Sequence, residues 1–171
     1  TWREIQDKLI VPKNRLIELT KGSLTLGSLI VEPFSVSHDA ADPIGINVFA
    51  GNDKATIVTD TGVISDDILR RIDDTTLLVL EANYDPHMLR FGPYQPFLKQ
   101  RVASDEGHLS NEMAAQALLM MKRPDFMQVI LAHRSENNNN AVLVTQTIGK
   151  MLVDGGVRIG PEMKLQHGQP N

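Results

Sequence analysis

The sequence predicts a single α/β domain, and three observations support that fold class. Two pairs of apolar, strand-like segments joined by glycine-containing turns come first, and helical and strand patterns alternate after them. Two of the later apolar runs, 75–82 and 126–132, are continuous, as expected for strands that are buried on both faces. With 171 residues the chain can bury one substantial core.

The expected elements begin with an amphipathic helix over 1–10 and a short extended segment over 15–19. A hairpin turns near Gly27 and runs on to Ser37, and a second hairpin, 44–49 and 54–59, turns around 51–53. The rest of the chain predicts helices over 65–72, 97–103, 110–121 and 138–154, strands over 75–82, 126–132, 157–159 and 163–166, and a loop over 83–96.

Composition excludes several classes of protein. The content of 42% hydrophobic and 22% charged residues is that of a globular domain. A net charge of −4 argues against binding nucleic acid through bulk electrostatics, although a local basic groove is compatible with it. The chain has no cysteine, so any metal must be held by His, Asp, Glu or water. No apolar run approaches the ~18 residues of a membrane span, and no signal peptide is visible, so we expect a cytoplasmic protein.

Three metal-ligating side chains follow apolar, strand-like runs. These are His38, Asp60 and His133. Ligands of α/β proteins gather where strands end, and a carboxylate can bridge two cations while a histidine holds each from outside. The pattern therefore predicts a dinuclear site in a metal-dependent hydrolase. The alternatives are a structural role for His38 and an Asx-turn at Asp60.

A second candidate group surrounds His108, which precedes the helix predicted from Ser110. A histidine beside a helix N-terminus can bind phosphate or donate a proton to a leaving oxygen. Lys99 and Arg101, on the preceding predicted helix, are candidates to clamp the same anion. The alternative is a helix entry in which Ser110 only caps and the two cations are ordinary surface residues.

Motifs around these residues occur in a characteristic order. They are Ser37-His38-Asp39-Ala40-Ala41-Asp42-Pro43, Thr59-Asp60-Thr61-Gly62, Glu81-Ala82-Asn83, Met88-Leu89-Arg90, Gly92-Pro93-Tyr94, Leu98-Lys99-Gln100-Arg101, Ser104-Asp105, Gly107-His108-Leu109-Ser110-Asn111 and Leu131-Ala132-His133. In this combination, over nearly the whole chain, the sequence resembles the metallo-β-lactamase superfamily, specifically its YycJ/WalJ-type metallohydrolase branch.

The resemblance implies an αββα sandwich with two divalent metal ions at one edge, and zinc, manganese or iron suit a site without thiolates. His38 would bind one metal, Asp60 would bridge, and His133 would bind the other. His108 would contact the scissile phosphate, with Ser110 and Asn111 supporting its loop at the phosphate-binding site. The implied activity is that of a nuclease or phosphodiesterase, with 5′-to-3′ exonuclease action on DNA as the most specific expectation.

Two features depart from the family pattern. Tyr84 stands where many relatives carry histidine, and the His-x-His-x-Asp-His motif does not occur between Thr1 and Asn171. We therefore expect a C-terminal portion of the fold, with a segment missing before Thr1 and too few ligands for activity by itself, since a stable site takes about four. The alternatives are a complete, non-catalytic binding protein and a hydrolase of small phosphodiesters.

Overall fold

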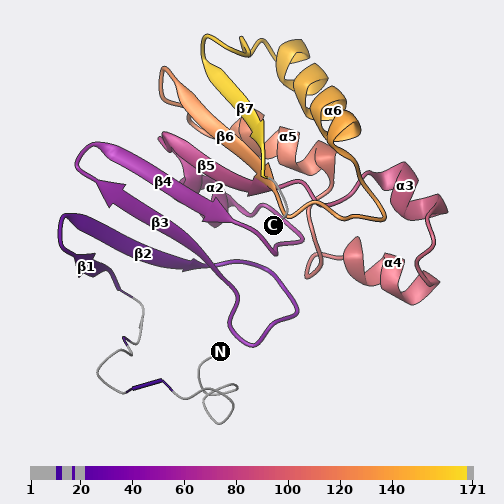
Figure 1. Ribbon diagram of the computed structural model, residues 1–171, viewed down its shortest axis with the longest axis horizontal. Helices are drawn as coiled ribbons and strands as arrows, with labels where there is room; N and C mark the ends of the chain where they lie inside the picture. The colour runs from indigo at the N-terminus through magenta and orange to yellow at the C-terminus, as the bar shows by residue number, and fades with distance from the viewer. Residues whose placement is uncertain (1–10, 13–16, 18–21, 169–171) are drawn as a thin grey trace.

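The computed structural model describes residues 11–12, 17 and 22–168, which form an α/β fold around one seven-stranded sheet (Figure 1). The strands are β1 (Leu24–Leu26), β2 (Leu29–Ser35), β3 (Ile44–Ala50), β4 (Asp53–Val58), β5 (Leu77–Glu81), β6 (Met127–Ala132) and β7 (Met163–His167). The helices are α2 (Asp66–Ile72), α3 (Pro86–Phe91), α4 (Pro96–Val102), α5 (Asn111–Met120) and α6 (Ala141–Asp154).

The sheet follows the order of the sequence, from β1 at one edge to β7 at the other. Strands β1 to β4 pair antiparallel through tight turns, and Gly27 and Gly51 supply the positive φ of 62° that those turns need. Strands β4 to β7 pair parallel. Parallel strands end at the same edge, so the loops after β4, β5 and β6 meet there.

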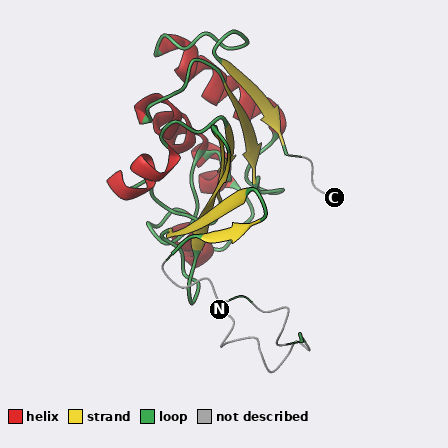
Figure 2. Ribbon diagram, turned by 90° about the vertical axis from the view of Figure 1, so that its left-hand side faces the viewer, coloured by secondary structure: helices red, strands yellow, loops and turns green. Residues whose placement is uncertain are grey.

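The core lies on one face of the sheet. Val58, Leu80 and Leu131, on three adjacent strands, are at most 2% exposed, and they pack with buried residues of α5 and α6. Burying each such side chain contributes roughly 1.5–3 kcal/mol. Figure 2 shows the helices gathered mainly on this side of the strands. The opposite face is more open, and Ile57 of β4 is 41% exposed there.

A smaller cluster fixes α3 and α4 beside the edge where β4, β5 and β6 end. The cluster consists of Tyr84, Leu89 and Val102, with Tyr94 and Leu98 packed against it. Lys99 joins the two helices, because its Nζ donates to the Arg90 carbonyl at 2.8 Å. Figure 1 shows α3 and α4 beside one another, away from the hairpin half of the sheet.

The structure corrects two expectations about secondary structure. Residues 83–96 are not all loop, because Asp85 caps α3 by accepting from the Met88 N–H at 2.8 Å, with Pro86 at the start of the helix. Residues 157–159 are not a strand, since only Ile159 forms an isolated bridge. The helix expected over 1–10 and nearly all of the extended segment over 15–19 lie outside the described residues.

The order of hairpins followed by alternating helices and strands is confirmed. Within the described part of the chain, each helix is too short or too polar to cross a bilayer. The expected cytoplasmic location stays a prediction.

Candidate metal centre

Turns at the ends of β2, β4 and β6 carry the three predicted metal ligands. His38 lies three residues beyond β2, Asp60 two residues beyond β4, and His133 directly after β6. Asp60 and His133 have positive φ angles of 55° and 51°. This left-handed backbone conformation is unfavourable for residues other than glycine, and strain of this kind concentrates at functional sites.

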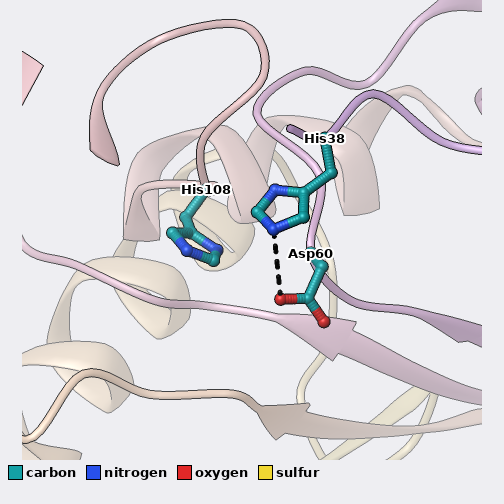
Figure 3. Close-up of side chains that lie close together, drawn as sticks. All are labelled: His38, Asp60 and His108. Atoms are coloured by element: carbon teal, nitrogen blue, oxygen red, sulfur yellow. Dashed lines mark ion pairs between the residues drawn. The ribbon is translucent and has the colours of Figure 1, made fainter. Parts of the chain in front are cut away.

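Two of the three side chains, His38 and His133, each face the third, Asp60. Asp60 Oδ1 lies 3.8 Å from His38 Nε2 and 3.6 Å from His133 Nε2. His38, Asp60 and His108 each offer a ligand atom within 4.8 Å of the others, as Figure 3 illustrates. The carboxylate of Asp60 thus lies between two imidazoles, which is the arrangement that the sequence predicts.

Hydrogen bonds fix the ring orientation of all three histidines. His38 donates from Nδ1 to the Gly107 carbonyl at 3.0 Å. His108 and His133 donate from Nδ1 to the same oxygen, Glu81 Oε1, at 2.6 and 2.9 Å. An acceptor on one ring nitrogen leaves the other with its lone pair free for a metal or a proton. In His38 and His133 that other nitrogen, Nε2, faces Asp60.

Glu81 is the functional residue that reasoning from the sequence missed. It ends β5, is fully buried, and its Oε2 accepts from the Thr61 N–H at 3.1 Å. Burial acts to raise the pKa of Glu81, but the hydrogen bonds from His108 and His133 outweigh burial and hold the pKa below its ordinary value. The ionised carboxylate in turn raises the pKa of His133. A carboxylate inside an otherwise apolar strand was the signal available in the sequence.

The loop of His108 is held by buried contacts. Ser110 caps α5, since its hydroxyl accepts from the Met113 N–H at 3.2 Å. Asn111 is fully buried, and its amide exchanges hydrogen bonds with Asn139 at 3.1 and 2.8 Å. These contacts fit the supporting role implied for Ser110 and Asn111, and direct contact of either with a phosphate stays a prediction.

The two predicted anion-binding cations have different surroundings. Arg101 pairs with Asp39 through Nε and Nη2, the latter at 3.0 Å from Oδ1, and this bond holds the pKa of Asp39 below its usual range. Arg101 borders a small hollow that His38 and His108 also line. Lys99 is bonded to the Arg90 carbonyl and is not among the residues that line the hollow. The position of Arg101 therefore favours contact with a bound anion more than that of Lys99 does.

Tyr84, which departs from the family pattern, is buried with only 6% of its surface exposed. Its ring packs in the cluster under α3 and α4, and burial raises the pKa of its hydroxyl. An effect of Tyr84 on substrate contacts stays a prediction.

The chemistry of the donor set fits a divalent metal. Two imidazole nitrogens and a carboxylate oxygen are ligands of zinc, manganese and iron, and bonds of 2.0–2.2 Å are typical of zinc. Ligand atoms bound to one cation at that length lie roughly 3–3.5 Å apart, and the 3.6 and 3.8 Å separations about Asp60 are close to this value. The fixed Nδ1 atoms add the outer hydrogen bonds that metal-bound histidines normally have.

Comparisons with known proteins agree with this geometry. Residues 3–133 match the model of the family described as "Beta-lactamase superfamily domain". The chain is 33% identical over 172 residues to exodeoxyribonuclease YycJ of Bacillus anthracis and 31% identical over 176 residues to exodeoxyribonuclease WalJ of Streptococcus pneumoniae. It covers 65% of the length of each of these relatives.

Solved structures share the fold at low sequence identity. The metallo-β-lactamase fold protein YhfI from Bacillus subtilis superposes with a TM-score of 0.66 at 13% identity, over 95% of this chain and 57% of that one. Zn²⁺-bound PqqB from Methylobacterium extorquens gives a TM-score of 0.57 at 17% identity, over 88% of this chain and 49% of that one.

Proposed function

This chain belongs to the metallo-β-lactamase superfamily, within its YycJ/WalJ branch, and we therefore propose that the protein is a metal-dependent phosphodiesterase that acts on DNA. The predicted α/β fold of that superfamily is confirmed. One observation carries the proposal: Asp60 Oδ1 lies between His38 Nε2 and His133 Nε2, at 3.8 and 3.6 Å. The names of the relatives support an exodeoxyribonuclease, and 5′-to-3′ polarity is the most specific form of the proposal.

In this proposal, His38, Asp60 and His133 hold two divalent metal ions with ligands from elsewhere in the protein. Bound metals of this kind acidify a water molecule and neutralise charge that develops on a phosphate. To bind a metal, His133 needs an unprotonated Nε2. The Nδ1–H that it donates to Glu81 selects the tautomer in which Nε2 carries no proton.

The proposed role of His108 is to contact the scissile phosphate and to donate a proton to the leaving oxygen. Its Nδ1 is committed to Glu81, so the remaining ring nitrogen is the one available to the substrate. Its ring centroid lies 5.1 Å from those of both His38 and His133. His108 is thus equally near both proposed metal ligands, and we expect the reacting phosphate to be bound beside it.

The test measures bound metal and hydrolysis of end-labelled duplex DNA by the full-length protein and by two variants. Asp60→Asn removes the proposed bridging charge, so metal content and hydrolysis should both fall sharply. Asp53→Asn, the matched control at the other, exposed end of β4, should change neither. Unchanged hydrolysis in Asp60→Asn would overturn the mechanism.

The same assay addresses the alternatives. If the labelled DNA is shortened from its 5′ end, the result supports the expected 5′-to-3′ polarity. Hydrolysis of small phosphodiesters without action on DNA would favour a small-substrate hydrolase, and so would binding of DNA that does not weaken as salt rises. Stoichiometric DNA binding without hydrolysis under any metal would favour a non-catalytic binding protein.

A further inference from the structure

The segment 86–104, which contains α3 and α4, differs in charge from the rest of the chain. It holds three cationic side chains, Arg90, Lys99 and Arg101, and no aspartate or glutamate, whereas the whole chain carries a net charge of −4. A local surface of this sign attracts polyanions even on an acidic protein. The surface lies next to the candidate metal centre, because Arg101 and His108 line the same hollow.

An aromatic ring stands on this surface. Phe97 is 69% exposed, and it precedes Arg101 by four residues in α4. Residues four apart lie on the same face of a helix, one turn of about 5.4 Å apart. Phe97 is therefore placed one turn further from the metal centre than Arg101, along the same helix face.

The orientation of Arg101 is set before any ligand binds. Asp39, the residue after His38, accepts from Nε and Nη2 of the guanidinium, while 59% of the Arg101 side chain is exposed. A guanidinium has five N–H donors in a fixed fork, so donors beyond those used by Asp39 face outward. A preorganised cation and an exposed ring, one helical turn apart, fit the spacing of a phosphate and its base in an unpaired strand.

We propose that α4 binds an unpaired nucleotide next to the cleaved phosphodiester, with Phe97 stacking on the base and Arg101 contacting a phosphate. This specificity contact rests on the proposed nuclease function. Charge favours a nucleic acid over a protein partner as the occupant, since Arg101 shares the helix face of the ring and lines the hollow beside the candidate metal centre. Bases of any sequence can stack, so the contact selects single-stranded ends and not a sequence.

The experiment measures anisotropy of fluorescent oligodeoxynucleotides bound to the full-length protein in EDTA, where no hydrolysis occurs. One oligonucleotide is intact, and a second of equal length has abasic nucleotides at its end. The variants are Phe97→Ala, Phe97→Leu and Phe97→Trp. Phe126→Ala is the matched control, because Phe126 is also exposed, at 46%, but precedes β6 at the strand end away from the site.

For the intact oligonucleotide, we expect Phe97→Ala and Phe97→Leu to weaken binding about tenfold, and Phe97→Trp and Phe126→Ala to stay within about twofold of the wild type. The wild type should bind the abasic oligonucleotide about as weakly as Phe97→Ala binds the intact one. Two results would overturn the base contact. One is wild-type affinity of Phe97→Leu for the intact oligonucleotide. The other is a loss of affinity caused by Phe97→Ala that is as large on the abasic oligonucleotide as on the intact one. Unchanged DNA binding in Phe97→Ala would also overturn it and point to a protein partner.

Failure of this contact and failure of the nuclease function give different results. Hydrolysis with added Mn²⁺ or Zn²⁺ is measured separately on the same preparations. If no phosphodiester is hydrolysed, the proposed function fails, and the anisotropy still decides whether Phe97 contacts a base. If DNA is hydrolysed and Phe97→Ala binds it normally, only the base contact fails.

Discussion

At the scale of single residues, Glu81 determines how the candidate site is organised. One buried carboxylate oxygen receives the Nδ1–H of both His108 and His133, so it sets the tautomer of a proposed metal ligand and of a proposed proton donor. In the proposed arrangement Glu81 acts through these two histidines. It is a positioning residue, and its removal should affect the two histidines together.

The substitution Glu81→Gln tests this role. The side chain keeps its shape but loses its charge, and its NH₂ group offers donors where both histidines need an acceptor. We expect metal affinity and kcat to fall roughly 10–100-fold, as for other partners of metal ligands, with the far-UV circular dichroism unchanged. Metal titration and steady-state kinetics make the measurement, and exposed Glu136, substituted in the same way, is the control. Wild-type metal affinity in Glu81→Gln would contradict the positioning role.

At the scale of elements, close packing of loops fixes the distance between α4 and the His108 loop. A Cβ on Gly107 would lie well inside contact distance of the Arg101 and Val102 carbonyl oxygens. The same residue presents the carbonyl that orients His38, and the His108 N–H donates to Val102 at 2.9 Å. Glycine at this position therefore lets the end of α4 and two site histidines approach one another.

The substitution Gly107→Ala should separate these segments. We expect a loss of about 1–3 kcal/mol in the free energy of unfolding, the usual cost of overpacking, together with a larger loss of kcat because His38 and His108 both shift. Urea denaturation and kinetics measure the two effects. Gly149→Ala, within α6, is the control. A Cβ there would meet only the side chain of Ile159, at an ordinary 3.8 Å, and alanine should stabilise the helix by about 0.5–1 kcal/mol. Gly107→Ala with normal activity would show that the spacing is not critical.

Local patterns predict most of the elements and part of the site. The tight glycine turns, the helix expected over 65–72 and the apolar runs of β5 and β6 are confirmed, because each depends on neighbouring residues alone. Helix α3 was missed, since a six-residue helix between prolines and glycines has little periodicity to read.

Long-range contacts explain what the sequence could not predict in the site. Strand-end positions indicated His38, Asp60 and His133 correctly as neighbours, because parallel strands bring their ends to one edge. The helix expected over 138–154 is α6, which Asn140 caps. The bonds of Asn139 to Asn111 and of Glu81 to two histidines join residues far apart in the chain, and no local pattern records such partners.

At the scale of the whole molecule, the site joins the two halves of the sheet. His38 follows β2 in the antiparallel half, His133 follows β6 in the parallel half, and Asp60 follows β4, the strand shared by both. An ion held by these side chains binds the folded chain far better than the unfolded one, where the three are distant in sequence. Metal binding should therefore stabilise the entire fold and not only the loops around the site.

The thermal midpoint of the full-length protein should then rise with added Mn²⁺ or Zn²⁺ and fall back when EDTA is added. Free metal at a hundred times its Kd contributes about 2.7 kcal/mol through binding to the folded state alone. Asp60→Asn should lose most of this increase, because the carboxylate between the two imidazoles is gone, whereas Asp53→Asn should keep it. Differential scanning calorimetry at several metal concentrations measures the effect. An equal rise in Asp60→Asn would place the stabilising metal elsewhere, since only a site that uses Asp60 links the two halves of the sheet in this way.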